Sequence, residues 1–218
     1  TAYSTLQAGP EHRDWLAARG PARRRRGDDG PRVSVRRDDD VLRITLTRPA
    51  VRNAYDAAMR DALLDAVAVA QADPTVQVVL DGRGPVFCSG GDLDEFGTLA
   101  DPASAHLVRI GHSVGHALHL VAGRLTAAVH GSCVGSGVEL AAFAGRVEAT
   151  PDTTFRLPEV AMGLVPGAGG TVSVSRRIGR HRTAWLALTG EAVDATTARA
   201  WGLVDEVAAP GDDSRPPL

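Results

Sequence analysis

Lysine is absent from the 218-residue chain, so all 24 basic residues are arginine. This absence excludes a Schiff-base lysine, a Walker-type phosphate loop and a Ser-Lys dyad. Any phosphate that the chain holds must therefore be bound by arginine side chains or by backbone N–H groups.

Aromatic residues and cysteines are also scarce. Aromatics make up 4% of a chain that is 44% hydrophobic, so we expect an aliphatic core. The only cysteines, Cys88 and Cys133, lie far apart and show no metal-like spacing, which argues against a disulfide framework and against a zinc site. Two small buried thiols are the simpler interpretation.

Long apolar runs and an excess of one charge are missing as well. No run approaches the roughly 18–20 residues that cross a bilayer, and residues 1–20 show no charged-then-apolar signal pattern. The formal charge of -2 gives no field that would attract nucleic acid or an anionic membrane. We therefore expect a soluble protein of the cytoplasm, without a nucleic-acid or membrane partner.

The composition and length fit one globular domain, which we place at residues 31–208. Residues 1–30 are interpreted as an extension, with a helical pattern around Glu11–Arg19 followed by the Arg-rich linker Arg23–Arg26. An address or a polyanion contact is the alternative for that run, but the acidic pair beside it favours a solvated linker. The Pro- and Asp-rich residues 209–218 are interpreted as a disordered tail.

Hydrophobic periodicity predicts alternating strands and helices. Period-two alternation predicts a hairpin of strands at Val33–Arg36 and Val41–Thr47, and helical spacing predicts a helix from Met59 to Ala70. The same reasoning predicts further strands at Val76–Leu80, Leu125–Val129 and Arg146–Ala149, and helices at Pro102–Ala122, from about Gly135, at Gly169–Ile178, Arg182–Thr189 and Ala195–Trp201. Strands separated by helices indicate an α/β fold with crossover connections.

Three segments carry small residues just before a new helix, where ligands of α/β folds bind. They are Gly82–Leu93, Val129–Leu140 and Phe155–Thr171. In the first, consecutive glycines can turn backbone N–H groups outward, and Asp92 can cap the following short helix. In the third, the apolar neighbours of Glu159 would raise the pKa of its carboxyl if they bury it.

Taken singly, each segment also fits a plain structural role: a glycine loop, a first-turn glutamate at Glu139, and an exposed glutamate at Glu159. Together and in this order, the motifs resemble the crotonase superfamily, which includes the enoyl-CoA hydratases and isomerases. The resemblance covers about residues 33–207 and is carried by Arg48-Pro49-Ala50-Val51-Arg52-Asn53-Ala54, Gly90-Gly91-Asp92, Gly135-Ser136-Gly137-Val138-Glu139-Leu140, Leu157-Pro158-Glu159 and Pro166-Gly167-Ala168-Gly169-Gly170-Thr171.

The resemblance implies a ββα spiral core and an oxyanion hole made of the backbone N–H groups of Gly91 and Ser136. Such donors stabilise an enolate on the thioester oxygen, and losing one typically costs ~10²–10³ in rate. By the same resemblance, Glu139 activates water, Glu159 delivers the proton to Cα, and the Gly167 N–H helps to hold the water. Two carboxylates favour hydration over isomerisation, because an isomerase needs only one proton shuttle.

The substrate implied is an acyl-CoA, with coenzyme A as part of the substrate and no separate cofactor or metal. Arg52 is expected to contact the CoA phosphates and Leu93 to line the adenine pocket, although plain surface and core roles compete. The substrate-binding set also includes Ala54, Gly90, Asp92 and Gly135. A homotrimer or a dimer of trimers is the assembly that the resemblance implies.

The chain departs from the family pattern near its C-terminus, at Ser136, and around Phe143-Ala144-Gly145-Arg146, where the Asp often found after the second motif is replaced. Only Ala208–Leu218 follow Val207, where family members continue with helices that cover the acyl site, so we expect most of that C-terminal helical segment to be missing. The N-terminal extension could substitute for it, or the acyl pocket could be more open. Ser136 stands where glycine is common.

His112, His116 and His119 recur at a spacing that could ligate a metal. On a continuous helix they would lie opposite an apolar stripe, so we expect them to face solvent or a partner chain. The apolar stripe consists of Leu107, Ile110, Val114, Leu118 and Val121.

Hydration of a 2-enoyl-CoA to a 3-hydroxyacyl-CoA is the predicted reaction. Alternatives within the superfamily are double-bond isomerisation, dehalogenation, thioester hydrolysis and decarboxylation. A ClpP-like serine hydrolase would use Ser89, Ser132 or Ser136, but none of these lies in a G-x-S-x-G motif. A non-catalytic acyl-CoA-binding subunit is the remaining alternative.

Overall fold

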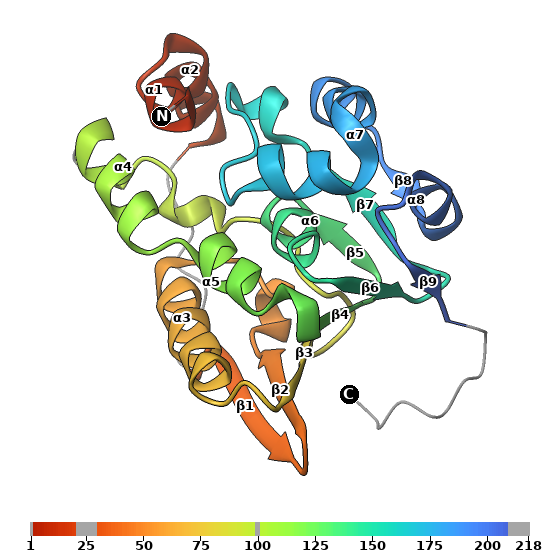
Figure 1. The fold of residues 1–218 in the computed structure, drawn as a ribbon. Helices are drawn as coiled ribbons and strands as arrows, with labels where there is room; N and C mark the ends of the chain where they lie inside the picture. Colours follow the sequence, from red (N-terminus) through yellow and green to blue (C-terminus); the bar gives the residue numbers. More distant parts are fainter. Residues whose placement is uncertain (1, 21–29, 99–100, 209–218) are drawn as a thin grey trace.

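The computed structural model describes residues 2–20, 30–98 and 101–208 (Figure 1). The Arg-rich run predicted as a linker and the tail predicted as disordered lie outside the described residues. The domain boundary at residue 30 stays a prediction.

A six-stranded sheet forms the centre of the fold, in the order β1-β2-β3-β4-β6-β9. The strands β1 (Val33–Asp38) and β2 (Val41–Leu46) pair antiparallel, which confirms the predicted hairpin. The other neighbouring strands pair in parallel. They follow β2 in the order β3 (Gln77–Gly82), β4 (Leu125–Val129), β6 (Arg146–Ala149) and β9 (Glu206–Val207). Alternation along β2 buries Leu42, Ile44 and Leu46 on one face, as period two requires.

A second, three-stranded sheet was not predicted. It consists of β5 (Ser132–Val134), β7 (Thr154–Arg156) and β8 (Val193–Asp194), in the order β5-β7-β8. These strands are too short for a period-two pattern to be visible in the sequence. The second sheet brings the segment after β4 beside the segment before Glu159.

The predicted helices surround the sheets, but one of them is divided in two and the two predicted at Gly169–Ile178 and Arg182–Thr189 are joined across a kink. The long helix expected at Pro102–Ala122 is two helices, α4 (Pro102–Gly111) and α5 (Val114–Leu120). The helix breaks because Ser113 caps α5, its hydroxyl accepting from the His116 N–H at 3.2 Å. The other helices are α1 (Ala2–Gln7), α2 (Pro10–Arg19), α3 (Ala57–Ala72), α6 (Ser136–Ala141), α7 (Gly170–Thr189, kinked at Gly179) and α8 (Ala195–Trp201).

The core is aliphatic, as the composition predicts, and it lies between the main sheet and α3, α5, α6, α7 and α8. Cys88 and Cys133 are both buried in it and face each other across an isolated β-bridge, so the prediction of buried thiols is confirmed. Among the described residues, no helix has the length and apolar character needed to span a membrane.

The N-terminal helices α1 and α2 pack on the core at the end where α4 and the loop before α7 lie (Figure 1). The buried His12 bonds through Nδ1 to the carbonyl oxygen of Met162 at 2.8 Å, and Arg19 forms an ion pair with Asp94. Trp15 contacts Phe96 edge-on, with 6.1 Å between ring centroids. Helix α1 was not predicted, because six residues are too few for a helical period to stand out.

Candidate active site

The loop Gly90–Leu93 is held in place by a parallel bridge between Tyr55 and Gly91. The Tyr55 N–H donates to the Gly90 carbonyl and the Asp92 N–H to the Tyr55 carbonyl, both at 2.8 Å. Gly90 has φ +98°, a conformation that favours glycine. Within the described residues, the Gly91 N–H donates to no backbone or side-chain acceptor, and Gly91 lines a pocket.

The second loop approaches the first at Gly135. An added Cβ at Gly135 would lie 3.7 Å from Gly90 Cα, and the glycine has φ +50°. Helix α6 begins at the next residue, Ser136, whose N–H also lacks an acceptor in the described part of the chain. Two N–H groups without acceptors, on adjoining loops that line one pocket, are the arrangement expected of an oxyanion hole.

Glu139 lies on α6, one turn after Gly135, and only 2% of it is exposed. Its Oε2 accepts hydrogen bonds from the N–H groups of Ala168 and Gly170, each at 2.7 Å. Burial raises the pKa of Glu139 to about 7, even though these N–H groups favour its anion. Glu139 is therefore a carboxyl that can take up or release a proton near neutral pH.

Glu159 is buried at 6% exposure, as the sequence predicts if its apolar neighbours enclose it. Its Oε1 packs against Gly135, since a Cβ there would meet Oε1 at 2.7 Å. Its Oε2 is buried without a hydrogen-bond partner among the described residues. Burial, followed by the nearby charge of Glu139, raises the pKa of Glu159 to about 8.

These groups line a single pocket of about 650 Å³. Of the predicted site residues, it brings together Gly90, Gly91, Asp92, Leu93, Gly135, Ser136, Glu139, Glu159 and Gly167. Arg52 is exposed and Ala54 is buried, and neither is among the pocket-lining residues. The Ser89 N–H donates to the Arg52 carbonyl at 3.0 Å, so the segment that contains Arg52 holds the loop that begins after Ser89.

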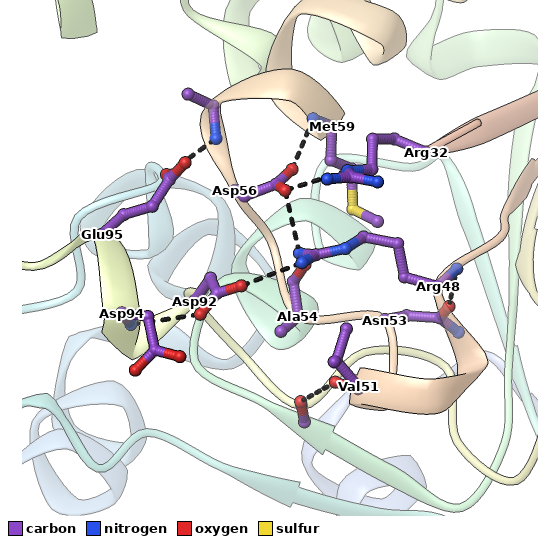
Figure 2. A network of polar contacts seen from close by, with 12 residues as sticks. Arg32, Arg48, Val51, Asn53, Ala54, Asp56, Met59, Asp92, Asp94 and Glu95 are labelled. Carbon is purple, nitrogen blue, oxygen red and sulfur yellow. Dashed lines mark hydrogen bonds and ion pairs between the residues drawn. The ribbon is translucent and has the colours of Figure 1, made fainter. Parts of the chain in front are cut away.

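The loop is anchored by a buried network of charges that the sequence did not reveal (Figure 2). Arg48 donates to Asp92 at 3.0 Å and pairs with Asp56 at 3.1 Å, while Arg32 donates to Asp56 at 3.0 Å. The other carboxylate oxygen of Asp92 accepts from the Asp94 N–H, which confirms the predicted cap. Asp92 is thus a structural anchor of the loop.

The pocket also contains residues that sequence reasoning missed. Tyr3 of α1 lies directly on Gly167, because an added Cβ would lie 2.2 Å from Tyr3 Cε2. Trp15 of α2 and Arg109 of α4 line the same pocket. No sequence signal near Tyr3 or Trp15 indicated which part of the core they contact.

The three histidines are exposed, as predicted, but the apolar stripe was wrong in part. Leu107 and Ile110 are 71% and 63% exposed, because the break at Ser113 gives α4 and α5 different inner faces. His112 lies 3.2 Å from Asp61 Oδ1. The part of the chain that the structure describes contains no cluster of three or more metal-ligating side chains.

Comparison with known proteins gives matches over most of the chain. The sequence profile described as enoyl-CoA hydratase/isomerase matches residues 36–213. The 2,3-dehydroadipyl-CoA hydratase of Escherichia coli (strain K12) is 35% identical over 174 residues, covering 79% of this chain and 68% of that protein. The trans-2-decenoyl-[acyl-carrier-protein] isomerase of Streptococcus mutans is 34% identical, with coverages of 79% and 68%. The crystal structure of an enoyl-CoA hydratase of Mycobacterium smegmatis superimposes with a TM-score of 0.76 at 32% identity, over 83% of this chain and 71% of that one.

The paired sheets, the adjoining glycine loops and the buried glutamates define a crotonase-superfamily fold, as the motifs predict. Within that superfamily, the chain belongs to the enoyl-CoA hydratase/isomerase family. The roles of the individual site residues stay predictions.

Proposed function

We propose that this protein hydrates a 2-enoyl-CoA thioester to a 3-hydroxyacyl-CoA, with Glu139 and Glu159 as its acid/base pair. The observation that carries the proposal is the pair of buried carboxyls in one pocket with two N–H groups that find no acceptor among the described residues. Glu139 accepts hydrogen bonds from backbone N–H groups, whereas Glu159 Oε2 has no hydrogen-bond partner in the described part of the chain.

The proposed reaction begins with addition of water to Cβ. The water oxygen bonds to Cβ as its proton passes to Glu139, and the π electrons move onto the thioester as an enolate. The N–H groups of Gly91 and Ser136 stabilise the enolate oxygen. The enolate then takes a proton from Glu159 at Cα, so the product contains one added water.

The starting state of this reaction has Glu139 ionised and Glu159 protonated. Burial raises the pKa of both carboxyls, and their different hydrogen bonding favours that state. The backbone donors of Ala168 and Gly170 stabilise the Glu139 anion, whereas Glu159 has no such donors on its free Oε2. A proton must return from Glu139 to Glu159 through solvent after each turnover.

The test is the loss of conjugated-thioester absorbance when purified protein is mixed with crotonyl-CoA or a longer enoyl-CoA. Turnover is expected, and Glu139→Gln and Glu159→Gln should each abolish it. Binding of the thioester without turnover would reject hydration, and no binding would reject the acyl-CoA assignment.

Isomerisation is the second candidate, since the Streptococcus mutans relative is named an isomerase. A single carboxyl with a free oxygen, such as Glu159, can move a proton between two carbons. Retention of activity on a 3-enoyl-CoA by Glu139→Gln would support isomerisation instead of hydration.

A cytoplasmic location and assembly as a homotrimer or a dimer of trimers are part of the proposal. The family membership supports the assembly, because the resemblance to the family implies it. Sedimentation of the purified protein tests the assembly, and a monomer at all concentrations would contradict it.

A further inference from the structure

One arginine that lines the pocket has no carboxylate within ion-pair distance in the part of the chain that the structure describes. Arg109, near the end of α4, is partly buried and lines the pocket. Within the described residues it forms no ion pair with a carboxylate. Arg60, the other arginine that lines the pocket, is already paired to Asp61 by bonds of 2.9 and 3.1 Å.

The contacts of Arg109 place it next to the reaction centre. Its guanidinium carbon lies 4.0 Å from the centroid of the Tyr3 ring, and Nη1 donates to Ser4 Oγ at 2.8 Å. The Tyr3 ring rests on Gly167, and the neighbouring N–H of Ala168 binds Glu139. The Tyr3 ring thus contacts both Arg109 and the loop that binds Glu139.

Among the described residues, most of the guanidinium donors of Arg109 have no acceptor. An arginine side chain carries five N–H donors in a planar arrangement that suits a carboxylate. The hydrogen bond to Ser4 uses one of these donors. An alkyl tail packed beside Arg109 would remove water from the unused donors, which is costly for a charged group. An acyl tail that ends in an anion would instead accept hydrogen bonds from these donors.

We propose that Arg109 is a specificity residue that binds a carboxylate at the far end of the acyl chain, so that the preferred substrates are dicarboxylic acyl-CoA thioesters. The proposal rests on the acyl-CoA assignment made above, but not on hydration. Tyr3 and Ser4 of α1 position the guanidinium.

The electrostatics of the pocket are consistent with an anionic tail. Burial raises the pKa of both glutamates, so near neutral pH the pair carries less than its full negative charge. Burial also lowers the pKa of Arg109, although the nearby Tyr3, Glu139 and Tyr55 oppose that shift. A carboxylate beside Arg109 would reverse that shift.

Two other roles for Arg109 predict different results. As an anchor of α1 alone, it would affect every ligand of the pocket equally. As a contact to the CoA phosphates, it would affect free CoA and all acyl-CoA thioesters equally. Only the proposed role predicts that Arg109 affects the binding of carboxylate-ended thioesters more than that of methyl-ended ones.

The experiment is calorimetric binding of saturated acyl-CoA thioesters, which cannot be hydrated. Pairs of equal chain length are compared, one ending in methyl and one in carboxylate, with free CoA as a third ligand. Wild type is expected to prefer the carboxylate-ended member, and Arg109→Met should weaken that member by about 10–100-fold, the value of a hydrogen-bonded charge pair. The methyl-ended member and free CoA should change by less than about 3-fold, below the effect of one net hydrogen bond.

Arg60→Met is the matched control, because it removes a pocket arginine whose charge is already paired. It should leave the preference for carboxylate-ended thioesters intact. Arg109→Lys keeps the charge but not the planar set of donors, so it should keep part of the preference for carboxylate-ended thioesters. This variant also controls for a folding defect in Arg109→Met.

Equal weakening of all three ligands by Arg109→Met, or no preference in the wild type, would overturn the proposal. Because the ligands are saturated, these outcomes are independent of whether the protein hydrates enoyl-CoA. Failure of every thioester to bind would instead reject the acyl-CoA assignment itself.

Discussion

Two regions of the chain bound the pocket, and only one of them lies within the residues that the family profile matches. The loops at Gly91, Ser136 and Gly167 and the two glutamates lie within the residues that the family profile matches. Tyr3 and Trp15 come from helices that precede that match. The core loops present backbone N–H groups and carboxyls, whereas the N-terminal helices present aromatic rings.

This difference separates two tasks. The groups suited to the chemistry are fixed in the core, by backbone bonds to Glu139 and by the buried charges around Arg48. The N-terminal helices contact the core beside these groups through side chains, with Tyr3 on Gly167, His12 on Met162 and Arg19 on Asp94. Changes in the core should therefore abolish turnover, and changes in the helices should alter what binds.

The largest expected effect is on turnover, in Glu139→Gln. Glutamine keeps an oxygen that can accept from Ala168 and Gly170 but cannot accept the proton of water. We expect kcat to fall by ~10²–10⁴, the usual value of a general base, with little change in KM. Steady-state kinetics measure it, and the exposed Glu191→Gln is the control. Undiminished hydration by Glu139→Gln would show that Glu139 is not the general base.

The next effect is on stability, in Arg48→Met. The substitution leaves Asp92 buried without its cation and removes one of the two arginines that pair with Asp56. Breaking a buried pair in this way costs about 3–5 kcal/mol in the free energy of unfolding. Urea denaturation measures the loss.

Arg37→Met is the matched control, because its pair with Asp73 is largely exposed and such pairs contribute about 0–1 kcal/mol. Equal losses in the two variants would show that the Arg48 network does not stabilise the loop more than a surface pair does.

A smaller effect is expected where the two regions touch, in Gly167→Ala. The added methyl overlaps the Tyr3 ring, and overpacking of this kind costs about 1–3 kcal/mol. Helix α1 should loosen, so its amides should exchange hydrogen faster. Tyr3→Ala combined with Gly167→Ala should remove the clash, and Gly111→Ala, which meets nothing within 4 Å, is the control. Unchanged exchange in Gly167→Ala would show that Tyr3 does not rest on the site in solution.

The smallest effect is the pH dependence of kcat/KM. Glu139 must be ionised, so activity should rise as the pH increases through its pKa of about 7. Glu159 must be protonated, so activity should fall as the pH increases through its pKa of about 8. The profile should be a narrow bell whose two limbs belong to the pair. An acidic limb near the ordinary glutamate pKa of about 4.3 would contradict the burial of the pair.

Much of the core could be predicted from sequence, because its signals are local. The strands Leu125–Val129 and Arg146–Ala149 and the helix Ala195–Trp201 have the predicted bounds, since each carries a clear period and flanking breakers. The glycine loops and both glutamates were found because small residues and carboxyls occur in a specific order. Most of these residues do line one pocket.

The rest depended on contacts between distant segments. Ser113 was not read as a cap, so α4 and α5 were merged and Leu107 was expected to be buried. The Arg48 pairs and the contact of Tyr3 with Gly167 join residues far apart in the chain. Such pairings follow from tertiary packing, which no local pattern encodes.

The most direct test of the central claim is mass spectrometry of the product formed from an enoyl-CoA in deuterium oxide. The two-carboxylate mechanism predicts a 3-hydroxyacyl-CoA that has gained one water, with one deuterium bonded to Cα. Glu139→Gln should give none of this product. A product of unchanged oxygen content, with deuterium incorporated by double-bond migration alone, would contradict hydration and assign the site to an isomerase.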